Sequence, residues 1–137
     1  MKLEVIQSEI NHYDHKGLPP AGDHELHDLV VETVSRLPKE IQFWLTNDCT
    51  HYFIGGFSQN DVLLCIYESP VEPNEGWCFR VILLPESLRQ CPKETALWCI
   101  SKGIAQSRLD VGDGDESNES EVDKLVLKWG FEKSPDC

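Results

Sequence analysis

Three apolar segments in the middle of the chain constrain the fold most strongly. Residues 49–57 (CTHYFIGGF), 61–69 (DVLLCIYES) and 76–84 (GWCFRVILL) are rich in β-branched, aromatic and aliphatic residues, and turn-forming residues separate them. Because the links are short, we expect a small antiparallel sheet of about three strands, connected as a meander. Helical patterns lie on both sides of these segments, so the expected class is α+β, with the sheet packed on helices.

Amphipathic helices are expected before and after this sheet. Asp23 is a suitable N-cap for a helix over residues 24–37, and Pro38 is expected near the first turn of a second, short helix. Apolar residues recur at helical spacing over about 92–109, the expected central buried helix, and again over about 119–130, the expected C-terminal helix.

One residue of the central helix is unexpected. Gly103 lies in its middle (ISKGIAQSRL), where glycine costs about 1 kcal/mol relative to alanine. A helix that keeps a glycine at such a position needs a structural or functional reason for it.

The length of the chain predicts how many domains it contains. With 137 residues, of which 40% are hydrophobic, the chain suits one compact domain with one core. We expect an N-terminal arm at 1–22, which ends in the breaker sequence GLPPAG, a single α+β domain at 23–131 and a tail at 132–137.

The charge of the chain excludes several classes of partner. A net charge of -12 repels nucleic acid and anionic membrane surfaces, so we expect neither as a partner. No stretch approaches the roughly 20 apolar residues of a membrane span, and the N-terminus lacks an apolar core of signal-peptide length, so a cytoplasmic location is expected. A protein or peptide partner fits these constraints, whereas the oligomeric state is not defined by them.

The six cysteines contain no CxxC pair, and several lie inside apolar runs. We therefore expect small buried thiols rather than a disulfide framework or a zinc site. They are Cys49, Cys65, Cys78, Cys91, Cys99 and Cys137.

The sequence HELH at 24–27 is close to the zinc motif HExxH. Two zinc-binding histidines on a helix must lie four residues apart, but the residue four after His24 is Asp28, and His27 is only three residues away. A weak metal site that uses His24, His27 and Asp28 is the alternative to a solvated helix face, which we favour because no third strong ligand is evident.

Residues 110–123 form an acidic stretch without Lys or Arg. Calcium is the obvious candidate ligand, but no frame of this stretch has the acidic residues, the Gly at position 6 and the Glu at position 12 of an EF-hand loop. A solvated loop is the favoured interpretation.

The order of these elements and four short sequence segments within them resemble those of a known protein family. LPKEIQFWL, RVILLPESL, ALWCISKGIAQSRL and ESEVDKLVLKWGF, in this order, resemble a small zincin-like metallopeptidase domain, over about residues 37–131. Such domains carry a strand, a helix that reads roughly HE-apolar-A-H, and a later helix that supplies an acidic ligand.

The resemblance implies a degenerate metal site. It places Lys102 where the first zinc-binding histidine stands, Gly103 at the general-base glutamate, Gln106 at the second histidine and Glu119 at the third, carboxylate ligand. Lysine has no lone pair at neutral pH, glycine has no side chain and glutamine is a poor zinc ligand, so zinc hydrolysis is not supported and no cofactor is expected.

The expected function is therefore a noncatalytic zincin-like domain, a pseudoenzyme that acts as a binding or regulatory module. A former cleft between sheet and central helix would hold the partner, with a strand added at the sheet edge. Lys102 is expected to pair with Glu119, and Gln106 to donate a hydrogen bond to the same carboxylate. The alternative is a hydrolase with an unusual metal site that uses other His and carboxylate residues.

Overall fold

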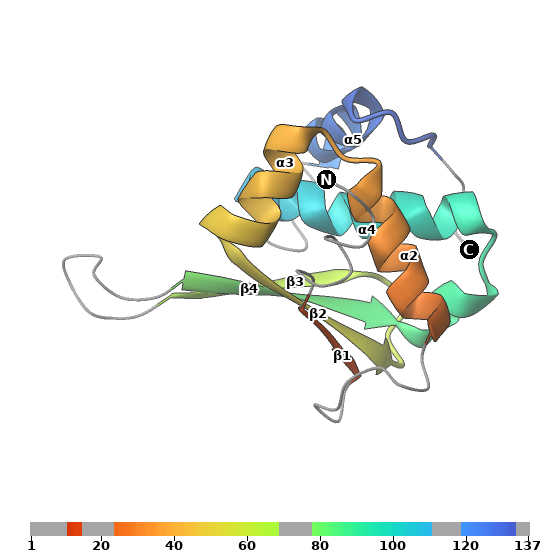
Figure 1. Cartoon of the computed structure of the whole chain (residues 1–137). Helices are drawn as coiled ribbons and strands as arrows, with labels where there is room; N and C mark the ends of the chain where they lie inside the picture. The colour runs from red at the N-terminus through yellow and green to blue at the C-terminus, as the bar shows by residue number, and fades with distance from the viewer. Residues whose placement is uncertain (1–10, 15–23, 69–77, 111–118, 134–137) are drawn as a thin grey trace.

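A computed structural model of the chain describes residues 11–14, 24–68, 78–110 and 119–133, and its helices and strands belong to the α+β class, as predicted (Figure 1). The strands are β1 (Asn11–Asp14), β2 (Thr50–Phe57), β3 (Leu63–Glu68) and β4 (Cys78–Pro85). The helices are α2 (His24–Ser35), α3 (Lys39–Phe43), the π-helical η1 (Trp44–Asp48), the 3-10 helix η2 (Glu86–Gln90), α4 (Lys93–Arg108) and α5 (Glu119–Lys128).

The sheet is mixed, so the predicted antiparallel meander is wrong. Its order is β1-β2-β4-β3; β2 and β4 are parallel, with Phe53 opposite Ile82, whereas β3 and β4 form the expected antiparallel pair. β4, the last strand in the sequence, thus lies between β2 and β3. Its nearly continuous apolar run, in which Ile82 and Leu84 are fully buried, is typical of a central strand.

A further strand comes from the expected N-terminal arm. Residues 11–14 form β1, which pairs in parallel with β2 in the register Asn11 opposite Tyr52. These four residues belong to the sheet rather than to a loosely held arm, because they supply hydrogen-bonding partners to one edge of β2.

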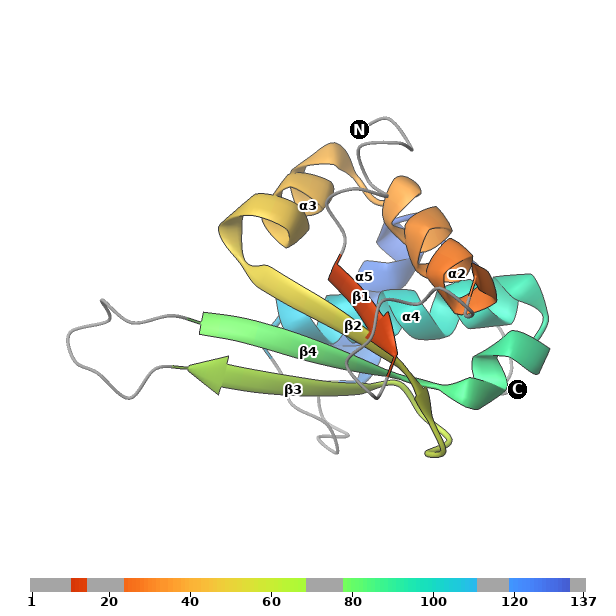
Figure 2. The same ribbon diagram turned by 60° about the horizontal axis from the view of Figure 1, so that its bottom comes forward.

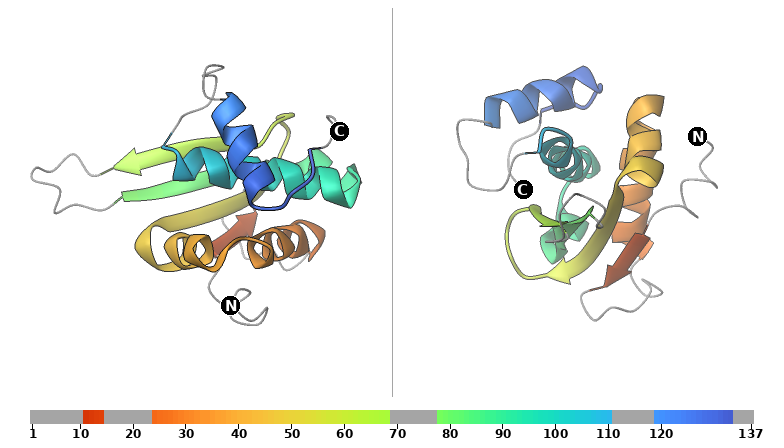
Figure 3. Two further views of the ribbon diagram at one scale, coloured as in Figure 1. Left: turned by 90° about the horizontal axis from the view of Figure 1, so that it is seen from above. Right: turned by 90° about the vertical axis from the view of Figure 1, so that its left-hand side faces the viewer.

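All the described helices cover one face of the sheet, which Figures 2 and 3 show from three other directions. The buried core lies between these layers. The sheet contributes Phe53, Leu64, Ile82 and Leu84; α2 contributes Leu26, Val30 and Val34; α4 contributes Leu97, Ile100 and Ile104; and α5 contributes Val122 and Val126. The expected central position of α4 is confirmed, since it packs against α2, α5, β3 and β4.

Gly130, which lies just after α5, explains why this helix ends where it does. Gly130 has φ +97°, and the amides of Gly130 and Phe131 donate to the carbonyls of Leu127 and Val126, at 3.0 and 3.3 Å. This is a Schellman C-cap, which favours glycine at the left-handed position. It turns the chain so that Phe131 is buried.

Within the described part of the chain, no helix combines the length and the apolar character that a membrane span requires.

Candidate functional site

Gly103 lies where α4 packs against the sheet. A Cβ atom at this position would lie 2.8 Å from Cγ1 of Val62 and 3.3 Å from Cγ2 of Ile82. Real Cβ atoms essentially never approach another heavy atom to less than 3.0 Å. Close packing of helix on sheet is therefore sufficient to explain the glycine, whether or not the position once carried a catalytic side chain.

The side of α4 that faces α5 carries Lys102. Its Nζ lies 3.7 Å from Oε1 of Glu119 and 3.4 Å from Oδ1 of Asp123, and Lys133 lies 3.6 Å from Oδ2 of Asp123. Two of the residues that the resemblance singles out, Lys102 and Glu119, are thus brought together as expected. Asp123 is the better buried of the two carboxylates, with 18% exposure of its side chain against 63% for Glu119.

Gln106 does not complete this cluster. No hydrogen bond joins Gln106 to Glu119, and Oε1 of Gln106 is buried without a hydrogen-bond partner among the described residues. Oδ1 of Asp123 is also buried without a hydrogen-bond donor, although Lys102 lies 3.4 Å away. We read that contact as an ion pair whose geometry is too poor for a hydrogen bond. The expected hydrogen bond from Gln106 is therefore absent.

The alternative metal site at His24, His27 and Asp28 stays a prediction, because one of its three side chains is not described. Among the described side chains, no group of three or more His, Cys, Asp or Glu residues is placed to hold a metal ion. His27 is half-buried and Asp28 is exposed on α2, whereas the side chain of His24 lies outside the described residues. Most of the acidic stretch, residues 111–118, also lies outside them, so the prediction of a solvated loop stays a prediction.

A buried polar cluster that sequence reasoning missed joins α4 to two strands. Nε2 of His51 lies 2.6 Å from Oγ of Ser107, and Nδ1 of His51 lies 3.0 Å from the carbonyl oxygen of Cys49. Arg80 donates to both the carbonyl oxygen and the Oγ of Ser107, and its Nη2 donates to Asp110 at 2.8 Å. His51 and Ser107 are 56 positions apart, so no local pattern could have paired them.

The partners of His51 define its protonation state. Because the Cys49 carbonyl can only accept, Nδ1 carries the proton and Nε2 accepts from the Ser107 hydroxyl. Burial lowers the pKa of His51 from 6.5 to about 4; the Cys49 hydrogen bond opposes this shift and the charge of Arg80 adds to it. The imidazole is therefore neutral at pH 7.

A Ser and His pair of this kind is the arrangement that activates a serine nucleophile. Here Ser107 is fully buried and His51 is only 3% exposed, and the Trp44 ring packs on His51 in a T-shaped contact with ring centroids 4.9 Å apart. No substrate reaches such a hydroxyl. The cluster instead fixes the end of α4 to β2 and β4.

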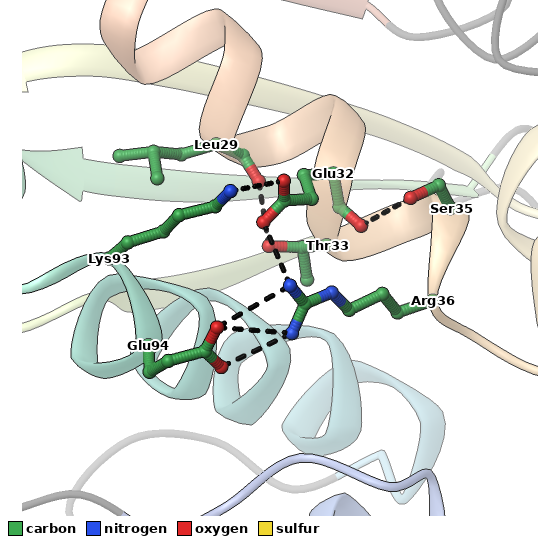
Figure 4. A network of polar contacts seen from close by, with 7 residues as sticks. All are labelled: Leu29, Glu32, Thr33, Ser35, Arg36, Lys93 and Glu94. Atoms are coloured by element: carbon green, nitrogen blue, oxygen red, sulfur yellow. Dashed lines mark hydrogen bonds and ion pairs between the residues drawn. The ribbon is translucent and has the colours of Figure 1, made fainter.

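The start of α4 is tied to α2 by a second, exposed network (Figure 4). Glu32 accepts ion pairs from Arg36 at 3.2 Å and Lys93 at 2.6 Å, and Arg36 also contacts Glu94 at 3.1 Å. These contacts bridge two helices whose apolar sides already meet in the core, so they orient the helices more than they stabilise them.

The cysteines are only partly as predicted. Cys49, Cys65 and Cys99 are half-buried and form no disulfide, but Cys91 is disulfide-bonded. The expectation of reduced thiols is therefore wrong for Cys91.

Comparison of the chain with protein-family models, curated proteins and solved structures finds no match. The interpretation of these sites therefore depends on their geometry and chemistry.

Proposed function

We propose that this chain is a noncatalytic, zincin-like binding or regulatory module in which the ammonium group of Lys102 takes the place of a metal ion between α4 and α5. The observation that carries the proposal is the position of this cation, 3.4 and 3.7 Å from oxygens of Asp123 and Glu119. A resident cation that belongs to the protein removes the need for a bound one, and it repels a metal ion from the same carboxylates.

The surroundings of Gly103 support the absence of hydrolysis. A zinc peptidase needs a carboxylate beside the metal to activate water. A glutamate at position 103 would have to enter space that Val62 and Ile82 occupy, since even a Cβ atom comes within 2.8 Å of Val62. Substitution of this one residue would therefore not recreate a base.

The same packing changes where a partner would bind. Because α4 lies directly on the sheet at Gly103, the expected open cleft between sheet and central helix is not available at this point. The face of the sheet turned away from the helices offers a different surface. Its half-buried side chains alternate with the core residues of β2 and β4 and are uncharged: Tyr52, Ile54, Val81 and Leu83. An apolar sheet face of this kind suits a protein or peptide partner.

Metal content tests the proposal directly. Untagged protein purified without chelators is analysed for bound metal and then titrated with zinc and calcium by calorimetry. We expect no bound metal and no binding in the micromolar range. Stoichiometric zinc that is lost in Glu119→Gln would contradict the proposal, because it would place a metal where Lys102 is assigned.

Variants of the alternative metal ligands on α2 serve as matched controls for Glu119→Gln. Stoichiometric zinc that survives Glu119→Gln but is lost in Asp28→Asn or His27→Ala would also contradict the proposal. It would favour a hydrolase with a metal site on α2.

A further inference from the structure

A cavity lies beside the start of α4. It has a volume of about 320 Å³, and the described residues that line it come from α2, η2, the link after η2 and the start of α4: Asp28, Leu29, Glu32, Leu88, Arg89, Cys91 and Lys93. Sites for small molecules range from about 300 to 1,000 Å³ and combine apolar walls with a few polar groups. This cavity is at the small end of that range and has both kinds of wall.

Three of the four described charged side chains that line the cavity are already engaged in ion pairs. Lys93 is paired with Glu32 at 2.6 Å, and Arg89 is paired with Glu86 at 2.7 Å. Asp28 also lines the cavity, but none of the described residues forms a hydrogen bond or ion pair with its carboxylate. Among the described residues, Asp28 is thus the charged lining residue that has no ion-pair partner.

Glu32, the other acidic residue of the lining, is held by two cations. Both Lys93 and Arg36 hold its carboxylate, and Glu94 holds Arg36 from the other side, as the dashed lines in Figure 4 show. Lys93 is therefore already engaged and cannot turn to Asp28 without giving up its 2.6 Å contact with Glu32. An anionic ligand would have to compete with Glu32 for Lys93 and with Glu86 for Arg89.

We propose that this cavity binds a small organic ammonium ion, with its cation toward Asp28 and its apolar body against Leu29 and Leu88. The inference is independent of the proposed function, because none of the lining residues belongs to the Lys102 cluster. Asp28 is exposed, so its ion pair with the ligand contributes modestly, about 1 kcal/mol or less, which corresponds to about fivefold in affinity.

Three probes of similar shape and different charge test this assignment. Binding of 2-phenylethylammonium, 2-phenylethanol and phenylacetate to the full chain is followed at pH 7 by amide chemical shifts in NMR spectra. We expect the ammonium ion to bind about two- to fivefold more tightly than the alcohol, and phenylacetate to bind most weakly. The amides of Leu29, Arg89 and Lys93 should shift.

Matched variants separate charge from shape. Asp28→Asn should lower the affinity for the ammonium probe to that for the alcohol and leave the alcohol unchanged, whereas Asp48→Asn, which removes an exposed carboxylate from η1, should change neither. The proposal is overturned if phenylacetate binds most tightly, if Asp28→Asn has no effect, or if no probe binds at millimolar concentration. None of these results would alter the outcome of the zinc titration.

Discussion

The two sides of α4 treat polar groups differently. The side that faces the sheet places the fully buried Ser107 in a hydrogen-bond cluster with His51 and leaves no room for a side chain at Gly103. The side that faces α5 holds Lys102 in ion pairs with side chains that are partly exposed to solvent. Lys102 and Gly103 are neighbours in sequence, yet their surroundings have little in common.

The difference shows which polar contacts are expected to matter for stability. A buried group that loses its partner bears the full cost of desolvation, whereas an exposed ion pair exchanges its partner for water at little cost. The Lys102 ion pairs, which the resemblance pointed to, are thus expected to contribute less to stability. The hydrogen bonds between His51 and Ser107, which no motif predicted, are expected to contribute more. Four experiments test this ranking.

The largest effect is expected for Gly103→Glu. A buried carboxylate forced against Val62 and Ile82 should lower the free energy of unfolding by about 3 kcal/mol or more. Gly103→Ala should cost about 0 to 2 kcal/mol, because overpacking is partly offset by a better helix propensity. Urea unfolding monitored by circular dichroism measures both. Wild-type stability of Gly103→Glu would show that α4 does not pack on the sheet at this position.

Acidification should weaken the His51 cluster next most strongly. The folded protein keeps His51 neutral down to about pH 4, whereas the unfolded chain binds a proton below 6.5. Stability should therefore be full above pH 6.5 and fall as the pH drops toward 4, by about 3 kcal/mol in total for this group. Urea midpoints of wild type and His51→Phe at several pH values isolate this contribution. Equal pH dependence in both proteins would contradict it, as would NMR evidence that His51 titrates near 6.5.

Ser107→Ala and Ser101→Ala compare two fully buried serines on the same helix. Ser107→Ala removes the donor to Nε2 of His51 and should cost about 1 to 3 kcal/mol. Ser101 donates only to the carbonyl of Trp98 within α4, so Ser101→Ala should cost less than about 1 kcal/mol. Thermal unfolding of the two variants side by side measures the difference. Equal losses would mean that the His51 contact adds nothing.

The smallest effect is expected for Lys102→Met. Glu119 is 63% exposed and is solvated once its partner is lost, and only Asp123 loses a nearby cation in a partly buried place. The free energy of unfolding should fall by about 1 kcal/mol or less, and high salt should diminish the difference from wild type. A loss that exceeds that of Ser107→Ala would reverse the ranking of the two sides of α4.

Local patterns predicted the elements well and their arrangement poorly. The periodicity of α4 and α5 and the β-rich composition of β2, β3 and β4 located these elements to within a few residues, because each pattern reflects contacts of one segment with one core. Lys102 and Glu119 were also predicted to meet, on the basis of the resemblance. Gln106 was wrong as a hydrogen-bond donor, because its contacts depend on how α4 and α5 are placed relative to each other.

The amino-acid sequence by itself determined the α+β class, the central helix and the negative net charge, since these depend on composition and on spacing along one segment. Only the tertiary structure decided that β4 lies between β2 and β3, that His51 meets Ser107, and that Val62 and Ile82 fill the space beside Gly103. Each of these features joins segments far apart in the chain. Their energies depend on the close packing of the whole core, which no single segment encodes.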